Sequence, residues 1–189
     1  MRRPPPRASG LKRPADIVFV LVLAGLSLYA LNRWGAGDTD TSDYRAIDGD
    51  SLRGGHGEIR LHGIDAPELH QECRDEGGRI YACGRRALDH LKSLIAGRVI
   101  ACTTLDIDRY QRRVARCTAG GRDLGGAMVK DGWAIAYLGH ALDYAGDEAQ
   151  AHAARRGLWA GDFEAPEDWR RQNRRAPSSL AASEALPPD

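Results

Sequence analysis

The stretch IRLHGIDAPE, residues 59–68, places one cation and two carboxylates around the expected end of a strand. Arg60 lies in an alternating, strand-like run, Asp65 ends that run, and Glu68 follows after a turn. A turn is expected there because Pro67 fixes its own backbone and favours turn conformations. These side chains could bind an anion, hold a cation and accept a proton.

A second acidic pair, Asp48 and Asp50, lies upstream at the DGDS turn. Hard cations such as Ca²⁺ are bound by carboxylate, carbonyl and water oxygens, so several carboxylates near turns are compatible with a calcium site. The simpler alternative is that the pair forms an Asx-type turn and that Asp65 only ends a strand. Spacing alone leaves both interpretations open.

A third polar stretch, DRYQRR at residues 108–113, is expected at the turn of a β-hairpin. Arginine holds a phosphate through two parallel hydrogen bonds and keeps its charge at any working pH. Arg112 beside Tyr110 therefore fits a phosphate-binding loop. Arg109 and Arg113 are expected to be solvated residues of the hairpin tip.

The elements that must position these residues form a small α+β domain with a mostly antiparallel sheet. Short strands broken by turns are expected over residues 44–65, and a helix over 83–97, where the apolar side chains share one face. Two strands joined by a turn are expected over 98–124. A short helix ending at Gly132 and a final helix over 143–159 complete the pattern.

Four stretches, IDGDS, IRLHGIDAPE, DRYQRRVA and DLGGAMVKDGWA, occur in the order and spacing of the staphylococcal nuclease (thermonuclease-like) family. The chain resembles this family over about residues 44–160, and DEAQAHAARRGLW resembles its last helix. The resemblance implies an OB-type, five-stranded antiparallel β-barrel with three helices. It also implies Ca²⁺-dependent cleavage of the phosphodiester bonds of DNA and RNA.

The resemblance implies a metal site and a proton acceptor. Asp50 and Asp65 match the family's calcium-binding carboxylates, and Ala66 takes the position that offers a backbone carbonyl to the metal. Glu68 matches the glutamate assigned as general base, or as the group that orients the attacking water.

The resemblance also implies how the substrate is held. Arg60 and Arg112 match the two phosphate-binding arginines, which with Glu68 complete the catalytic set. Tyr110 and Tyr137 match tyrosines that line the nucleotide pocket. Gln111 departs from the family's usual glycine, which leaves the geometry of that turn open.

The N-terminus has its own composition. Five basic residues precede an uncharged run over residues 17–31, so residues 1–16 are expected to be a basic cytoplasmic segment and 17–34 a signal anchor or a cleaved signal peptide. A buried core helix is the alternative. Residues 35–43 suit a linker to the domain at 44–163, and a flexible tail is expected over 164–189.

The distribution of charge limits how the domain could bind nucleic acid. Residues 1–34 hold six of the 27 Lys and Arg residues and one of the 26 acidic residues, so the remainder carries a net charge of −4. Such a domain would bind nucleic acid through a local site and not through an overall basic field.

The four cysteines, Cys73, Cys83, Cys102 and Cys117, include no CxxC pair, which argues against structural zinc. An even count behind an export signal favours disulfides over reduced, buried thiols. The sequence-local pairing would join Cys73 to Cys83, and Cys102 to Cys117 across the expected hairpin.

The main functional hypothesis is a monomeric Ca²⁺-dependent nuclease that acts on DNA or RNA outside the cytoplasm, membrane-anchored or secreted. One alternative is a catalytically silent OB-fold module that binds nucleic acid or protein at the cell envelope. Another is a structural envelope protein. The presence of Arg60, Glu68 and Arg112 together favours the enzyme.

Overall fold

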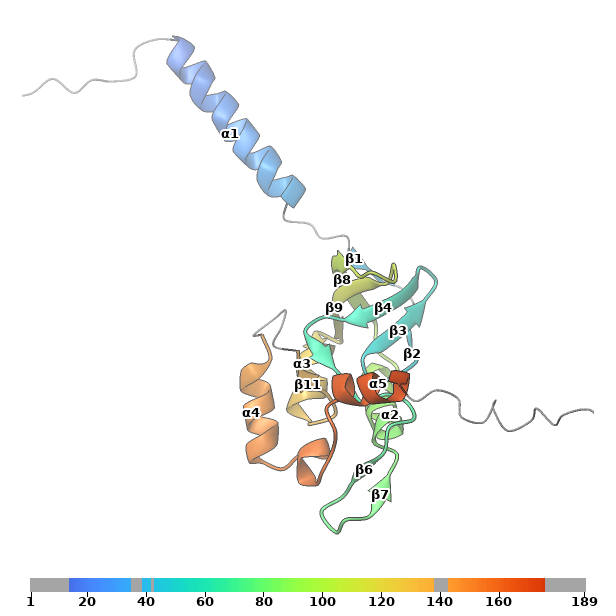
Figure 1. Cartoon of the computed structure of the whole chain (residues 1–189). Coiled ribbons are helices and arrows are strands. Elements are labelled where there is room, and N and C mark those ends of the chain that lie inside the picture. Colours follow the sequence, from blue (N-terminus) through green and yellow to red (C-terminus); the bar gives the residue numbers. More distant parts are fainter. Residues whose placement is uncertain (1–13, 35–38, 42, 138–142, 176–189) are drawn as a thin grey trace, which may run out of the picture. The chain divides into compact units, whose positions relative to one another are not determined.

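The structure is a computed structural model that describes residues 14–34, 39–41, 43–137 and 143–175 (Figure 1). It divides into two compact units, residues 1–38 and residues 39–189. The first unit contains α1 (Pro14–Trp34). The strands of the second unit are β1 (Thr39–Asp40), β2 (Arg45–Ala46), β3 (Ser51–Gly54), β4 (Gly57–Leu61), β5 (Ile64–Asp65), β6 (Cys73–Arg74), β7 (Ile80–Tyr81), β8 (Ile100–Ile107), β9 (Arg113–Ala119), β10 (Arg122–Asp123) and β11 (Ile135–Ala136). Its helices are α2 (Cys83–Ile95), α3 (Leu124–Lys130), α4 (Ala145–Ala153), the 3₁₀ helix η1 (Gly157–Ala160) and α5 (Pro166–Arg175).

Helix α1 covers the apolar N-terminal run. In the part of the chain that the structure describes, no helix combines the length and the apolar character that crossing a membrane requires. The anchor or signal segment expected at residues 17–34 stays a prediction.

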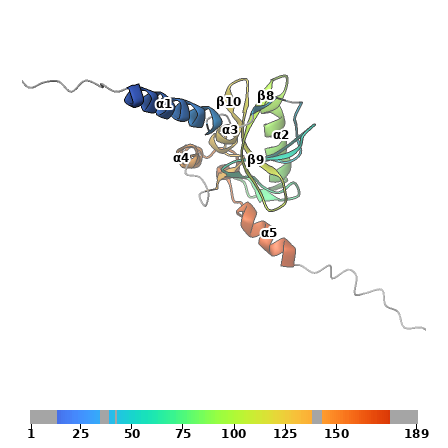
Figure 2. The ribbon, with the colours of Figure 1, turned by 90° about the horizontal axis from the view of Figure 1, so that it is seen from above.

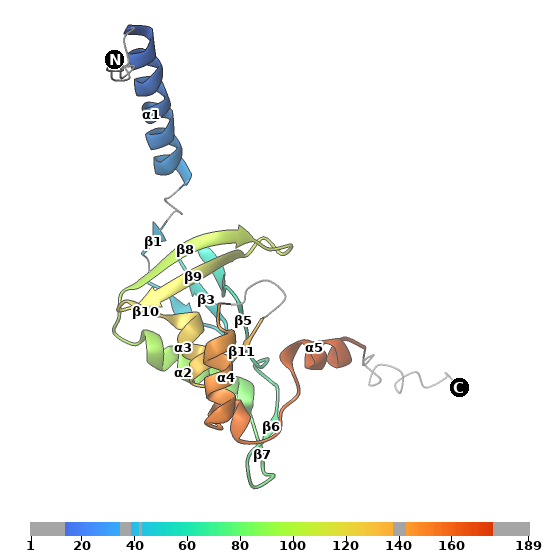
Figure 3. The same ribbon diagram turned by 90° about the vertical axis from the view of Figure 1, so that its left-hand side faces the viewer.

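The main sheet of the second unit has the strand order β1-β8-β9-β4-β3-β2, with β10 paired to β9 (Figure 3). Neighbouring strands in this sheet run antiparallel, except for β4 and β9, which run parallel. Two further pairs, β5–β11 and β6–β7, form small sheets of their own. The prediction of an α+β fold is confirmed. The structure differs in detail from the predicted OB-type barrel of five antiparallel strands with three helices, because the described strands form an open path with one parallel pair and the described residues contain five α-helices.

The core lies between the sheet and helices α2 and α3. Helix α2 has the predicted one-sided apolar pattern, and Ala87, Leu88 and Leu91 are buried on that side. They pack in one cluster with Leu52 and Ile59 of the sheet. Figures 1 and 3 both show α2, α3 and α4 together at one end of the sheet, so the other end is left open for a site.

Both expected disulfides are present. Cys102 of β8 is the register partner of Cys117 of β9, and the bond between them crosses the hairpin. Cys73 and Cys83 join strand β6 to the start of α2. The pairing expected from sequence proximity is thus confirmed.

The segment after residue 163 was expected to be a flexible tail, yet α5 occupies Pro166–Arg175. The helix has recognisable local causes. Pro166 suits the first helical position, and Glu167 and Asp168 lie in the first turn, where the helix dipole favours acids. Residues 176–189 lie outside the described residues.

The backbone that follows β5 is in direct contact with the start of α2. A Cβ atom added at Gly84 would lie 1.8 Å from the backbone oxygen of Glu68 and 3.0 Å from Cα of Leu69. Only a residue without a side chain allows this approach. The helix therefore sets the position of the Glu68 backbone.

We expect Gly84→Ala to lower the free energy of unfolding by about 1–3 kcal/mol, because the added methyl must displace backbone atoms. Urea denaturation of the oxidised protein, followed by circular dichroism, measures this change. Gly146→Ala is the matched control, since Gly146 also lies in the first turn of a helix but has nothing within 4 Å of an added Cβ. Equal stabilities of the two variants would contradict the packing described above.

Candidate active site

The open end of the sheet holds a cleft with a volume of about 1070 Å³. Five residues singled out from the sequence line it: Arg60, Glu68, Tyr110, Arg112 and Tyr137. The strand pairings bring them together. Arg60 is the register partner of Val114 in the parallel β4–β9 pair, two residues from Arg112. The backbone N–H of Tyr137 donates to the carbonyl of Gly63, next to β5.

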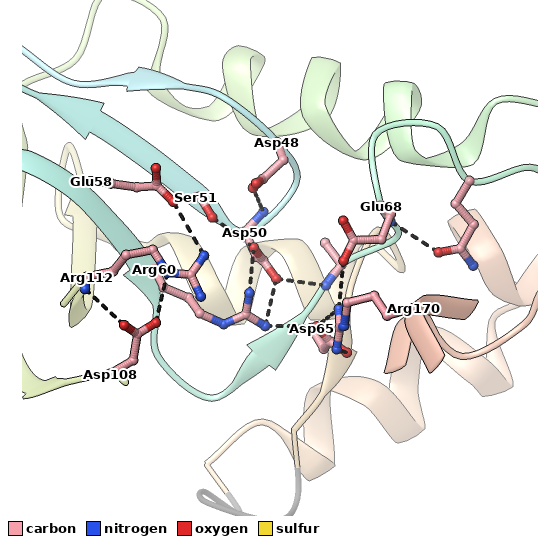
Figure 4. A network of polar contacts seen from close by, with 12 residues as sticks. Asp48, Asp50, Ser51, Glu58, Arg60, Asp65, Glu68, Asp108, Arg112 and Arg170 are labelled. Carbon is pink, nitrogen blue, oxygen red and sulfur yellow. Dashed lines mark hydrogen bonds and ion pairs between the residues drawn. The ribbon is translucent and has the colours of Figure 1, made fainter. Parts of the chain in front are cut away.

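Arg60 is held by two buried carboxylates at the floor of this cleft (Figure 4). Its Nη1 donates to Asp50 Oδ1 at 3.2 Å, and its Nη2 donates to Asp65 Oδ1 at 2.8 Å. The side chains of Asp50 and Asp65 are 6% and 1% exposed. The antiparallel β3–β4 pair produces this arrangement, because Ser51, the neighbour of Asp50, is the register partner of Arg60.

The acidic turn around Asp50 is closely packed. The backbone N–H of Ala66 donates to Asp50 Oδ2 at 3.2 Å, and the backbone N–H of Asp50 donates to Asp48 Oδ1 at 3.0 Å. The Asx-type turn considered for Asp48 is therefore present. An added Cβ at Gly49 would lie 2.7 Å from the Cβ of Ala66. The turn thus brings Asp50, Asp65 and Ala66 together as predicted.

The charge state of Asp50 reflects its burial. Desolvation raises the pKa of Asp50 to about 7. The charge of Arg60 opposes this shift, whereas the charges of Asp48 and Asp65 add to it. Arg60 carries one positive charge beside two carboxylates. Its own pKa is raised, chiefly by the charge of Asp50.

Arg112 is positioned by the hairpin turn. Its Nε donates to Asp108 Oδ2 at 2.8 Å, and its backbone N–H donates to Asp108 Oδ1 at 2.9 Å. Desolvation would raise the pKa of Asp108, but the hydrogen bonds from Arg112 and Tyr110 outweigh it and lower that pKa. Gln111, which stands where a glycine is usual, adopts the left-handed conformation with φ of 64°. The turn therefore keeps its shape without glycine.

The two arginines expected to be solvated have partners. Arg109 lies over the ring of Tyr110, with 5.0 Å between its Cζ and the ring centroid. Arg113 donates to Asp40 Oδ2 at 3.1 Å and to the hydroxyl of Tyr44 at 3.0 Å. The prediction for Arg113 was wrong, because the strand turns its side chain towards the N-terminal strand β1 and not towards solvent.

Glu68 lies at the rim of the cleft, with its side chain 38% exposed. Its backbone N–H donates to Oε1 of Gln71 at 3.1 Å. Gln71 is fully buried and donates through Nε2 to the carbonyl of Glu164 at 2.7 Å. Sequence reasoning missed Gln71, since one glutamine in a polar loop gives no periodic signal.

The sequence of the chain matches a known protein family. A family model described as staphylococcal nuclease homologue matches residues 58–161. The chain belongs to the staphylococcal nuclease homologue family. The match covers Arg60, Asp65, Glu68 and Arg112, while Asp50 lies just before it.

Several curated relatives of this nuclease homologue are similar over part of their length. A probable staphylococcal-like nuclease, CAN3, of Oryza sativa subsp. japonica is 35% identical over 62% of this chain and 29% of its own. The succinoglycan biosynthesis protein ExoI of Rhizobium meliloti is 33% identical over 53% of this chain and 54% of its own. The probable endonuclease LCL3 of Candida dubliniensis is 33% identical over 54% of this chain and 47% of its own. The chain thus spans at most about half the length of these relatives.

The donor atoms of this nuclease homologue fit a hard cation. Asp50 and Asp65 offer only oxygen, the ligand type that Ca²⁺ prefers, and Arg60 carries one positive charge beside these two buried carboxylates. In the arrangement described here, however, no three His, Cys, Asp or Glu side chains among the described residues are grouped to hold a metal ion. A second arginine contacts Asp65.

That second arginine is Arg170 of α5, which the sequence analysis did not identify. Its Nη2 donates to Asp65 Oδ2 at 2.9 Å, and its Nη1 donates to Glu68 Oε1 at 2.9 Å. The acids and arginines of EDWRRQNRR could have predicted the helix. No local pattern could have predicted which of its arginines reaches the cleft.

The raised pKa of Asp50 gives a pH prediction for the metal-free protein. A carboxyl whose pKa is higher in the folded than in the unfolded state stabilises the fold at low pH, and this contribution is lost as pH rises. We expect the free energy of unfolding, measured with a chelator, to fall between about pH 4 and about pH 7. Asp50→Asn should flatten this fall. Asp89→Asn, at an exposed position on α2, is the control, and a fall that survives in Asp50→Asn would contradict the assignment.

Proposed function

We propose that the protein is a nuclease that hydrolyses phosphodiester bonds of DNA or RNA with the help of Ca²⁺. The observation that carries the proposal is that Arg60, Arg112 and Glu68 line one cleft above the buried pair Asp50 and Asp65. The names of two relatives, a probable nuclease and a probable endonuclease, support the same activity.

Arg60 and Arg112 suit the recognition of a phosphodiester. Both guanidiniums are partly exposed, at 24% and 27% of the side chain, and each is held from behind by carboxylates. Fixed guanidiniums can donate to phosphate oxygens without reorganising. Because negative charge on these oxygens grows in the transition state, both arginines stabilise it more than the bound substrate.

Glu68 suits the role of proton acceptor. Its carboxylate is at the rim of the cleft, and its backbone is fixed by Gln71 and by the close approach of Gly84. It can take a proton from an attacking water, an effect that is typically worth about 10²–10⁴-fold. A Ca²⁺ ion held by Asp50, Asp65 and the Ala66 carbonyl would supply positive charge that polarises the phosphoryl group.

The opposite wall of the cleft favours flexible, single-stranded substrates. Tyr110 is 61% exposed, and Leu105 and Ile107 of β8 are about half exposed beside it. Nucleobases stack on aromatic and apolar side chains when the strand is not paired. A duplex would keep its bases away from this wall.

The two disulfides support a place of action outside the cytoplasm. Disulfides persist in oxidising compartments and are rare in the reducing cytoplasm. Cys73–Cys83 and Cys102–Cys117 leave no free cysteine in the described chain. We propose an exported enzyme on this ground. The alternative, a silent binding module, gives no reason for a proton acceptor beside two phosphate-binding arginines.

Cleavage tests the proposed function directly. We expect the oxidised full chain to cleave single-stranded DNA or RNA in saturating Ca²⁺ and to lose this activity in a chelator. Glu68→Gln should lower the rate about 10²–10⁴-fold, as expected for loss of a general base. Arg79→Ala is the control, since Arg79 is 85% exposed on the β6–β7 hairpin. A folded wild type that cleaves neither polymer with any divalent ion would show that it is not a nuclease.

The salt dependence of binding measures how many phosphates are held. Each phosphate neutralised on a single strand contributes about −0.7 to the slope of log K against log salt. Using Glu68→Gln as the uncleaving parent, we expect Arg112→Ala to make the slope shallower by about 0.7, measured by fluorescence anisotropy. The same change at Arg79 should leave the slope unaltered. An unchanged slope in Arg112→Ala would mean that Arg112 does not contact phosphate.

A further inference from the structure

Arg170 lines the cleft, and the proposed reaction does not use it. Its Nη1 and Nη2 donate to Asp65 Oδ1 and Oδ2 at 3.0 Å and 2.9 Å, and Nη1 also donates to Glu68 Oε1 at 2.9 Å. Figure 4 shows the guanidinium between the two carboxylates. Arg170 therefore contacts both the expected metal ligand and the expected proton acceptor.

These contacts take up the oxygens of Asp65. Oδ1 accepts from Arg60 and from Arg170, and Oδ2 accepts from Arg170. Asp65 is 1% exposed, so water cannot readily replace a lost partner. A cation bound by either oxygen of Asp65 would lie beside a guanidinium, and the repulsion between the two positive charges favours displacement of the guanidinium. Arg60 is also held by Asp50, and Arg170 is also held by Glu68.

Charge explains why a guanidinium is stable here. Asp50, Asp65 and Glu68 lie around one site, and like charges so close together repel unless positive charge is added. Burial would lower the pKa of Arg170, but its hydrogen bonds to Asp65 and Glu68 raise it above its usual value. Arg170 thus supplies the positive charge that a divalent cation would supply.

Helix α5 is attached in a way that permits release. Figures 2 and 3 show it standing apart from the sheet and the other helices of its unit, and among the residues that the structure describes no other helix or strand packs extensively against it. The segment just before it is anchored firmly instead. The backbones of Arg74 and Asp162 exchange two hydrogen bonds, and Gln71 donates to the carbonyl of Glu164. The helix can therefore leave the cleft while residues 162–164 stay in place.

We propose that α5 is an inhibitory arm, in which Arg170 occupies Asp65 and Glu68 until a divalent cation displaces it. The inference rests on the proposed function, because it takes these two carboxylates to be a metal ligand and a proton acceptor. Cation and arm compete for the same oxygens. The arm would keep the enzyme inactive at low Ca²⁺ and make its activation depend on the Ca²⁺ concentration.

Metal binding without nucleic acid tests the arm separately from catalysis. We expect Arg170→Ala in the oxidised full chain to bind Ca²⁺ at least about tenfold more tightly than wild type in calorimetric titration, because the charged hydrogen bonds no longer have to be broken. Arg170→Lys should fall between the two, since it keeps the charge but loses the paired donors. Arg171→Ala, at the next position, should behave as wild type because Arg171 is exposed and pairs with Asp168.

Hydrogen exchange of the wild type provides a second readout that needs no variant. Saturating Ca²⁺ should speed amide exchange in residues 166–175 while leaving residues 83–95 of α2 protected. Equal or weaker Ca²⁺ binding by Arg170→Ala, or slower exchange of α5 with Ca²⁺, would overturn the inhibitory arm and leave the nuclease proposal intact. Tighter binding without any cleavage would support the arm and count against the nuclease.

Discussion

Two buried carboxylates, Asp50 and Asp65, are the constraint on which the rest of the structure depends. Burying one ionised carboxylate is costly, and burying two side by side is more so, unless positive charge comes with them. The strand β4 supplies Arg60 to both, and the pairing of β3 with β4 fixes the distance. Arg170 of α5 adds a second guanidinium at Asp65.

Several parts of the fold bring charged side chains to this site. The parallel pairing of β4 and β9 brings the hairpin arginine Arg112 to the same cleft, with Asp108 fixing its guanidinium. The loop after β5 delivers Glu68, whose backbone is held by Gln71 and by Gly84 of α2. The Cys73–Cys83 disulfide joins β6 to α2, and the backbone of Arg74 in β6 exchanges hydrogen bonds with Asp162. Asp162 lies shortly before α5, the helix that carries Arg170. In the proposed function, the cation and Arg170 are alternative partners of one acidic centre, whereas the substrate phosphate is bound by Arg60 and Arg112.

The sequence was informative where chemistry depends on short, local patterns. Arg60 of β4, Asp65 of β5 and Glu68 lie close together in the sequence, so their proximity could be predicted from one short stretch. The amphipathic α2 and the disulfide across the β8–β9 hairpin were predictable for the same reason. The open sheet with a parallel β4–β9 pair was not, because strand order depends on contacts far apart in the chain. Arg170 was missed because a polar helix carries no sign of which arginine meets a carboxylate 105 positions away.

The two disulfides have a consequence for recovery after unfolding. Each disulfide closes a short loop, because its two cysteines are 15 residues apart in Cys102–Cys117 and 10 residues apart in Cys73–Cys83. The covalent bond keeps the loop closed when the fold is lost. The first loop contains Arg112, and the second begins just after Glu68. A heat-denatured, oxidised chain therefore retains the local enclosure of both segments, which spares refolding about 2–4 kcal/mol of closure free energy at each. While the disulfides remain intact, refolding then depends chiefly on bringing the two closed loops together with the strands that carry Asp50 and Asp65.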